Sequence, residues 1–197
     1  MSSFEVEWLQ QALEGDDSAF ANIVETYQRP VYNLCYRMLG DPIDAEDAAQ
    51  ETFWRAYQNL KRYDQRRSFP TWLLSIAAHY CIDQQRKRRL PILSMDILPE
   101  EDAPDVAPGP EKLVSELEES SQMRKLLDKL GPKDRAAIIL RYWYDFSEEE
   151  IASSLSLTVS AVKSRLHRAR KVLALNWQEA QSQNPLPERR KNESPAI

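Results

Sequence analysis

One stretch decides the fold of the second half of this chain: Ser147 to Leu173 read S-E-E-E-I-A-S-S-L-S-L-T-V-S-A-V-K-S-R-L-H-R-A-R-K-V-L. The letters describe a short amphipathic helix, a tight polar turn and a longer basic helix. Ser147 and Glu150 have the spacing of a capping box, and Thr158 or Ser160 can cap the second helix. This order of elements predicts a helix-turn-helix, a motif that binds DNA.

The second helix of the motif has an apolar stripe and a basic face. Val162, Leu166, Ala169 and Leu173 recur at helical spacing. From Thr158 onward this helix contains five Lys/Arg and no Asp/Glu, although the whole chain has a formal net charge of −5. Such segregated charge suits a phosphate backbone, whereas a single charged run is more often a solvated helix face. The agreement of cap, turn and charge favours DNA. The predicted duplex-binding residues are Ser160, Lys163, Ser164, Arg165, His167, Arg168 and Lys171.

Composition predicts an all-α fold with two small helical domains. The 197 residues include only 4 glycines, and apolar residues, 42% of the chain, recur every three or four positions. This pattern breaks where acids and prolines accumulate after the first half of the chain. We therefore predict an N-terminal domain over residues 1–90, a flexible acidic linker over 91–111, a C-terminal domain over 112–180 and a disordered tail over 181–197.

Composition also argues against several classes of protein. The two cysteines, Cys35 and Cys81, lie on apolar helical faces and lack the spacing of a zinc site, so we expect buried thiols. With two His, no Gly-rich phosphate loop and no metal-ligand cluster, nothing in the sequence indicates an enzyme, a cofactor or a metal. No apolar run has the length of a membrane span and the N-terminus is acidic, which predicts a cytoplasmic protein without membrane insertion.

Two adjoining amphipathic helices are predicted in the N-terminal half. The first covers residues 18–39, where Pro30 can introduce a kink, and Gly40 and the residues after it end the helix. Asp44 is the predicted cap of the second, which runs to Leu60. The outward face of the second helix is either a protein-binding surface or an ordinary solvated face with a half-buried Trp, and the pattern favours neither. The residues of this face are Asp47, Gln50, Glu51 and Trp54.

A third helix is predicted over residues 69–89, which read F-P-T-W-L-L-S-I-A-A-H-Y-C-I-D-Q-Q-R-K-R-R and end in four consecutive cationic residues. Between residues 61 and 90, eight Lys/Arg face two acids, with aromatic residues interleaved. Aromatic rings can stack on bases while cations hold phosphates, so this pattern is typical of single-stranded DNA binding. The alternative is that the rings belong to a helical core, which the pattern favours for Trp72 and less so for His79 and Tyr80.

Three stretches together resemble an extracytoplasmic-function (ECF) sigma factor, a small two-domain bacterial RNA polymerase initiation factor of the sigma-70 family. They are D-A-E-D-A-A-Q-E-T-F-W-R-A-Y from Asp44, the stretch from Phe69 quoted above, and E-I-A-S-S-L-S-L-T-V-S-A-V-K-S-R-L-H-R-A-R-K from Glu150. The resemblance spans nearly everything from Ser18 to Gln178. It implies a non-catalytic protein that binds core RNA polymerase, recognises promoter DNA and supports strand opening and transcription initiation. It also implies an anti-sigma factor as a regulator.

The resemblance implies a role for each surface. The helix over residues 45–60 would dock on the clamp helices of the polymerase largest subunit through Asp47, Gln50, Glu51 and Trp54. The helix-turn-helix would read the minus-thirty-five element in the major groove, and the acidic linker would run toward the polymerase active-site and RNA-exit channels. The loop over residues 63–68 would lie near an extruded base. The residues implied at the melted minus-ten element are Lys61, Arg62, Tyr63, Arg66, Arg67, His79, Tyr80, Asp83, Arg86, Lys87, Arg88 and Arg89.

Two positions depart from the family pattern. His79 stands where the family usually has Asn, so a contact to the nontemplate strand, and base preference with it, can differ. Ser156 stands where the family commonly has Gly, and a left-handed backbone angle there would cost a Ser residue some free energy. Neither change removes the motif.

Two alternatives come from other classes of protein. One is a helix-turn-helix regulator that acts without polymerase, which would bind duplex DNA tightly on its own. The other is a helical enzyme or adaptor with incidental basic helices, which would support no promoter-dependent transcript formation. A sigma factor would bind promoter DNA weakly alone and tightly with core polymerase.

Overall fold

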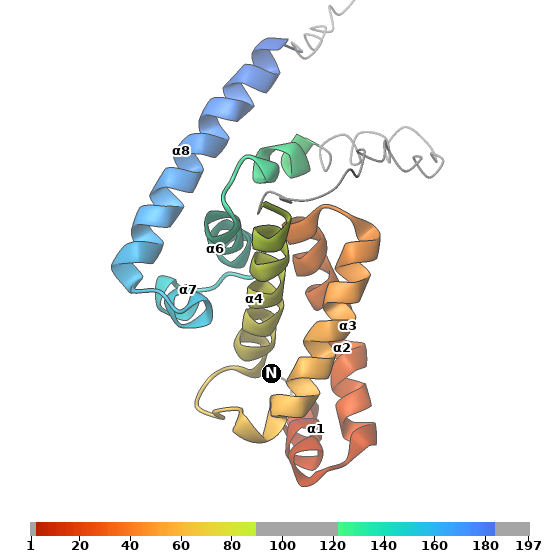
Figure 1. Ribbon diagram of the computed structural model, residues 1–197. Helices are drawn as coiled ribbons and strands as arrows, with labels where there is room; N and C mark the ends of the chain where they lie inside the picture. The colour runs from red at the N-terminus through yellow and green to blue at the C-terminus, as the bar shows by residue number, and fades with distance from the viewer. Residues whose placement is uncertain (1–2, 90–121, 184–197) are drawn as a thin grey trace, which may run out of the picture.

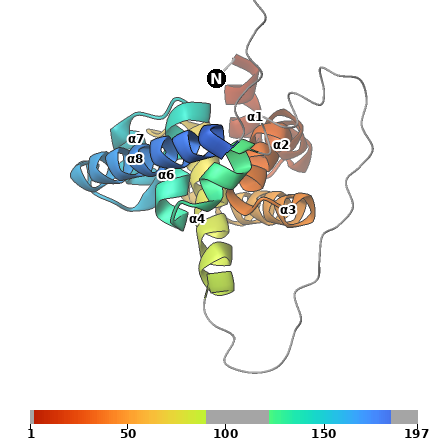
Figure 2. The same cartoon turned by 90° about the horizontal axis from the view of Figure 1, so that it is seen from above.

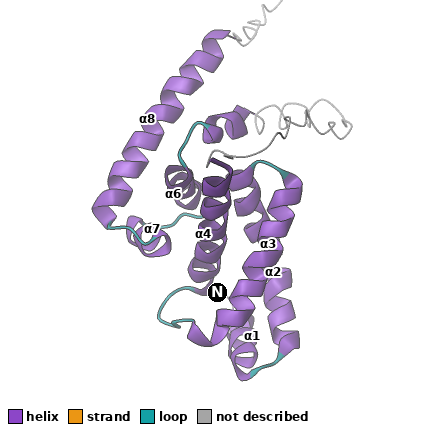
Figure 3. Cartoon of the chain, in the orientation of Figure 1, coloured by secondary structure: helices purple, strands orange, loops and turns teal. Residues whose placement is uncertain are grey.

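The computed structural model describes residues 3–89 and 122–183, and every regular element in these ranges is a helix (Figures 1 and 3). The all-α prediction is confirmed. The helices form an N-terminal and a C-terminal cluster. The N-terminal cluster contains α1 (Ser3–Glu14), α2 (Asp17–Leu39), α3 (Pro42–Asn59), the 3-10 helix η1 (Leu60–Arg62) and α4 (Phe69–Arg89). The C-terminal cluster contains helical residues 122–128, α6 (Pro132–Trp143), α7 (Glu148–Leu155) and α8 (Val159–Gln183). The predicted linker lies outside the described residues, and α8 continues into the predicted tail.

α2 is the central helix of the N-terminal cluster and packs against α1, α3 and α4. The Asp16 side chain accepts hydrogen bonds from the first backbone N–H groups of α2, and Gly40, with φ of 82°, ends the helix in the left-handed conformation. The helix continues through Pro30. The helix is amphipathic as predicted, because the apolar residues of one side are buried or partly buried in the core: Phe20, Ile23, Val24, Tyr27, Val31, Leu34, Cys35 and Met38.

α3 begins earlier than the sequence pattern indicated. Asp41 Oδ1 accepts the Asp44 N–H at 2.9 Å, so Asp41 is the cap and the cap predicted at Asp44 is wrong by one turn. Pro42 occupies the first helical turn, where the missing N–H of proline would have had no helical partner. α3 is amphipathic as predicted, and its buried side consists of small and apolar residues together with Thr52: Ala48, Ala49, Thr52, Phe53 and Ala56.

α4 closes the N-terminal core from the remaining side. Phe69 and Leu73 are almost fully buried, and the Phe69 ring meets the Tyr27 ring edge-on with centroids 5.7 Å apart. Cys35 of α2 and Cys81 of α4 are buried free thiols, as predicted. The apolar face of α4 therefore fixes the direction in which its polar C-terminal end points.

The two clusters pack against each other along a seam, with α2 and α4 on one side and α6 and α7 on the other (Figures 1 and 2). At the C-terminal end of α2, Arg135 Nη1 donates to the Met38 carbonyl at 2.7 Å and Arg124 Nη1 to the Gly40 carbonyl at 3.3 Å. The last carbonyls of a helix lack internal partners and carry the negative end of its dipole, so they attract guanidinium groups. Arg135 is only 3% exposed and also pairs with Asp128 at 2.8 Å.

Further polar contacts run along the seam. Tyr144 donates its hydroxyl to the Pro30 carbonyl at 2.6 Å, and burial raises the pKa of Tyr144, so it remains a donor at neutral pH. Nearer the N-terminus of α4, Arg67 donates to the Ser153 hydroxyl, and the Thr71 hydroxyl lies 3.4 Å from a Glu150 carboxylate oxygen. No local sequence pattern predicted this seam, because its partners lie far apart in the chain.

Candidate nucleic-acid and protein interfaces

The predicted helix-turn-helix is present as α7 and α8. The Ser147 hydroxyl accepts the Glu150 N–H at 3.1 Å, and the Glu150 carboxylate accepts the Ser147 N–H at 2.8 Å, which completes the capping box. Thr158 caps α8 by accepting the Ala161 N–H at 3.2 Å. Ser156 in the turn has φ of 53° and ψ of 52°, so this position does require the left-handed conformation.

α8 presents a polar, basic face on the side opposite its core stripe of Val162, Leu166 and Ala169, which are buried. We call this surface the reader face. Six of its seven predicted residues are exposed and Arg165 is half-buried. The seven are Ser160, Lys163, Ser164, Arg165, His167, Arg168 and Lys171.

Acidic residues of the same cluster pair with three cations of the reader face. Lys163 Nζ lies 3.5 Å from a Glu148 carboxylate oxygen, whereas Arg165 and Arg168 share the carboxylate of Asp134 at 2.6 and 3.1 Å. Asp134 lies in the first turn of α6 and was not predicted to take part in the site. No local sequence pattern could have found it, since the contact depends on how α6 packs against α8.

The C-terminal end of α4 is the second basic surface, which we call the strand face. Arg86 and Lys87 are exposed and have no acidic partner among the residues with described side chains. Arg88 Nη2 pairs with an Asp44 carboxylate oxygen at 2.5 Å. Arg89 is the last residue of α4, and its side chain lies outside the description. Lys61 and Arg62 of η1, with exposed Asp83 of α4, are further predicted residues on the N-terminal cluster.

His79 and Tyr80 of α4 differ in the exposure of their rings. His79 is exposed, with Nδ1 2.9 Å from the Ser75 carbonyl. Tyr80 is half-buried, and the Arg55 guanidinium lies 4.9 Å from the centre of its ring. Arg55 therefore covers one face of the Tyr80 ring, which makes His79 the more accessible ring for stacking.

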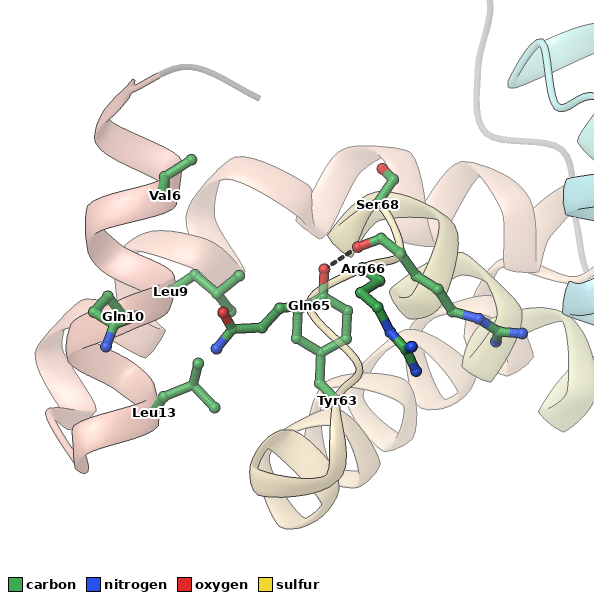
Figure 4. Close-up of a pocket in the computed structure, with 9 residues that line it drawn as sticks. Val6, Leu9, Gln10, Leu13, Tyr63, Gln65, Arg66 and Ser68 are labelled. Atoms are coloured by element: carbon green, nitrogen blue, oxygen red, sulfur yellow. Dashed lines mark hydrogen bonds between the residues drawn. The ribbon is translucent and has the colours of Figure 1, made fainter.

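Tyr63 was expected at the melted strand, and the structure places its ring in the core. It is 8% exposed, and its ring centroid lies 5.5 Å from Phe69 and 5.1 Å from Trp72. Its hydroxyl donates to the Arg67 carbonyl (Figure 4). Tyr63 thus contacts the loop over residues 63–68 from its inner side, and the charged loop residues Asp64, Arg66 and Arg67 are exposed.

A cavity of about 360 Å³ lies between α1 and this loop (Figure 4). α1 contributes Val6, Leu9 and Leu13 to its wall, and the loop contributes Gln65 and Arg66, among others. A neighbouring Asp64 holds the Arg66 side chain at 3.0 Å, and this hydrogen bond lowers the pKa of Asp64. α1 was not predicted to take part in the site, and the exposure of its Val6 is visible only in the structure.

The outward face of α3 carries the four residues predicted to bind a protein. Trp54 is 58% exposed, so the alternative of a half-buried Trp is not what the structure shows, and Asp47 and Gln50 are exposed as well. Glu51 is partly buried and pairs with Arg55 at 2.6 Å. A groove of about 690 Å³ adjoins this face between α2 and α3, with Gln50 on its wall. We call the surface the α3 face.

Metal binding and membrane insertion have no counterpart in the described part of the chain. Residues 3–89 and 122–183 contain no group of three or more His, Cys, Asp or Glu side chains that could hold a metal ion. Within the same ranges, no helix combines the length and the apolar character needed to cross a bilayer.

Comparison with known proteins identifies the family of this chain. The sequence profile of Sigma-70 region 2 matches residues 23–90, and that of Sigma-70 region 4 matches residues 120–173. The chain is 41% identical to the ECF RNA polymerase sigma factor SigW of Bacillus subtilis over 172 residues, which cover 84% of this chain and 92% of SigW. The chain belongs to the ECF sigma factors of the sigma-70 family. SigX of Bacillus subtilis is 33% identical over 80% of this chain and 82% of its own length.

Solved structures show the same helical fold. CnrH, solved in complex with the cytosolic domain of CnrY, aligns with a TM-score of 0.67 at 25% identity and covers 90% of this chain and 99% of its own. The sigma factor RpoE from Bartonella quintana, solved with the anti-sigma factor NepR, gives a TM-score of 0.64 at 24% identity over 81% of this chain and 96% of RpoE.

As an ECF sigma factor, the protein directs RNA polymerase to promoters and binds DNA through the region 4 helix-turn-helix. The family is non-enzymatic and binds core RNA polymerase. The two alternatives from other classes, a polymerase-independent regulator and a helical enzyme or adaptor, are thereby set aside.

Proposed function

We propose that the three surfaces divide promoter recognition between them. The α3 face docks on core polymerase, the strand face holds the melted minus-ten element, and the reader face binds the duplex minus-thirty-five element. The observation that carries this assignment is the separation of charge: two basic surfaces lie on different clusters of an acidic chain, and the α3 face carries exposed Trp54 beside acids. Cations suit phosphates, whereas an exposed Trp suits a protein partner.

Strand capture in this proposal combines backbone and base contacts. Arg86 and Lys87 hold phosphates, and His79 supplies an exposed ring for a base. The cavity beside Gln65 and Arg66 is a candidate pocket for an extruded base, which matches the role that family resemblance implies for the loop. Binding energy at these contacts offsets the cost of unpairing, so the protein needs no catalytic group.

Simultaneous binding of both promoter elements requires the seam to open. The two elements are about 25 base pairs apart, or roughly 85 Å of duplex at 3.4 Å per step. A compact chain of this length has a radius of gyration of about 16 Å, so it cannot span that separation while its clusters stay packed together. We therefore propose that the seam parts when the protein binds core polymerase.

A cross-linking experiment tests the opening. Thr71→Cys and Ser153→Cys place reactive thiols on the α4 and α7 sides of the seam, while Cys35 and Cys81 are buried. A short bismaleimide that joins the two new thiols should abolish promoter-dependent transcription with core enzyme. Each single variant treated in the same way is the control. Full activity of the cross-linked double variant would contradict the opening.

The division of roles is tested by binding with and without core enzyme. We expect weak promoter binding by the free protein and tight, sequence-dependent binding with core polymerase. Equally tight, sequence-specific binding without core would contradict the assignment of the α3 face. We also propose that the protein works in the cytoplasm and that an anti-sigma factor covers these surfaces, since RpoE was solved with such a partner.

A further inference from the structure

Asp134 occupies a position from which one carboxylate controls two cations of the reader face. It lies in the first turn of α6, which packs against α8, and its side chain is 15% exposed. Asp134 Oδ1 accepts from Arg165 Nη1 at 2.6 Å, and Oδ2 accepts from Arg168 Nε at 3.1 Å. A further contact joins Arg168 Nη2 to Oδ1 at 3.4 Å. Asp134 therefore ties together two arginines that sit one turn apart on α8.

The two arginines use different edges of their guanidinium groups. Arg168 faces Asp134 with its Nε–Nη2 edge, so Nη1 and the outer hydrogen of Nη2 remain free. Those two groups form the edge that can donate two parallel hydrogen bonds to the O6 and N7 acceptors of a guanine. Arg168 is also 59% exposed, which places the free edge where DNA can reach it.

Arg165 is held in a different way. Its side chain is 29% exposed, and its Nε is buried without a hydrogen-bond partner. The short contact from Nη1 to Asp134 leaves Arg165 less able to turn toward a base than Arg168. Arg165 thus fixes the carboxylate, and the carboxylate in turn fixes Arg168.

We propose that Asp134 is a positioning residue for promoter specificity: it holds Arg168 in the rotamer that presents its free edge to a guanine in the minus-thirty-five element. A flexible Arg loses rotamer entropy when it binds, and a side chain that is already held loses less. The held arginine also rejects bases that do not match its fixed donors. This inference rests on the proposed role of the reader face.

Glu148 provides a matched control. It also pairs with a cation of the reader face, Lys163, but through a single contact at 3.5 Å to an ammonium group. An ammonium group is a point charge without a fixed fork of donors, so fixing it adds little base selectivity. Asp134→Asn and Glu148→Gln each remove one negative charge close to the reader face, and they differ in the cation that they release.

The experiment measures base discrimination by holoenzyme assembled from full-length variant and core polymerase. Transcription is compared between a promoter with its own minus-thirty-five element and versions with each base pair changed in turn. The discrimination ratio is transcription from the unaltered promoter divided by transcription from the promoter with one base pair changed. We expect Asp134→Asn to lower this ratio by about 3- to 10-fold at one guanine, part of the effect of a complete bidentate contact. Glu148→Gln should leave that ratio unchanged, and Asp134→Glu should restore part of it.

The outcomes distinguish the positioning role of Asp134 from the proposed DNA-binding role of the reader face. If Arg168→Ala leaves use of the minus-thirty-five element unaltered, the proposed role of the reader face fails. If Arg168→Ala lowers the ratio and Asp134→Asn does not, only the positioning role fails. An equal change of transcription on every promoter in Asp134→Asn would identify a general charge effect and would likewise overturn the proposal. Thermal unfolding and core affinity of each variant exclude a folding defect.

Discussion

The strand face at the end of α4 and the reader face of α8 are both basic, but their cations are held differently. On the strand face, Arg86 and Lys87 have no acidic partner among the described side chains and Arg88 pairs with Asp44 alone, whereas Arg165 and Arg168 of the reader face share the carboxylate of Asp134. Free cations on a helix end suit phosphates, whose positions vary and whose charge does not depend on sequence. A cation fixed by a carboxylate suits a base edge, because base readout depends on donor geometry. The difference indicates that charge alone does not distinguish holding DNA from reading it.

The largest effect is expected at the α3 face, which contains no residue of either basic surface. Trp54→Ala on the α3 face should weaken core polymerase binding by about 2 kcal/mol or more, the size typical of an interface Trp. Both basic surfaces would then lose function together, since each binds promoter DNA only while the protein is docked on the polymerase. Affinity for core measured by fluorescence anisotropy tests this. Asp47→Ala should weaken core binding by less, and wild-type affinity in both variants would contradict the assignment.

The next prediction separates base recognition from phosphate binding within α8. Arg168→Ala should cost about 1–3 kcal/mol of discrimination at one position of the minus-thirty-five element. Lys171→Ala is the matched control, because Lys171 is exposed on the same face and has no acidic partner among the described residues. Competition binding with altered promoters measures both. Equal losses on all sequences in the two variants would remove the distinction between them.

A smaller, sequence-independent effect is expected at the strand face. Arg86→Ala combined with Lys87→Ala should weaken promoter binding about equally for all minus-ten sequences. The slope of log affinity against log salt should become shallower by between about 1 and 2, since each lost phosphate contact contributes 0.7 to 0.9. A titration of holoenzyme binding against salt gives this slope. A change in minus-ten base preference without a change in slope would mean that these cations read bases.

The smallest effect concerns the turn that sets the angle between α7 and α8. Ser156 has a left-handed backbone, which costs an L-residue about 1–2 kcal/mol of stability. Glycine avoids this cost, but its more flexible unfolded state lowers the stability of the folded protein by about 0.5–1 kcal/mol. Ser156→Gly should therefore stabilise the protein by about 0.5–1 kcal/mol, as measured by urea unfolding.

Gly40 gives the reverse test of the same argument. Its φ is 82°, and a Cβ added there would lie 3.7 Å from the Arg124 side chain, an ordinary contact. Gly40→Ala should therefore destabilise the protein through its backbone alone, by about 1 kcal/mol. If both variants left the midpoint of urea unfolding unchanged, the left-handed backbone at Ser156 would carry no measurable strain.

Local features of the fold were predictable because their causes lie close together in the chain. The capping box of Ser147 and Glu150, the apolar stripe of α8 and the inner side of α2 each repeat within one or two helical turns. The left-handed backbone at Ser156 was indicated by resemblance to the family, which commonly has Gly at this position, and not by the turn residues themselves. The missed cap at Asp41 shows the limit of this approach, since two nearby Asp residues offered the same local signal.

The sequence by itself determined an all-helical chain, the faces that its helices expose, and two basic surfaces on an acidic protein, because periodicity and charge are properties of consecutive residues. Only the tertiary structure decided which cations are held, that the Tyr63 ring is buried, and that Arg135 closes a seam on the Met38 carbonyl. Asp134 and Arg168 are 34 residues apart, and Arg135 and Met38 are 97 apart. Contacts over such separations depend on the angle and register at which helices pack, which no single helix encodes.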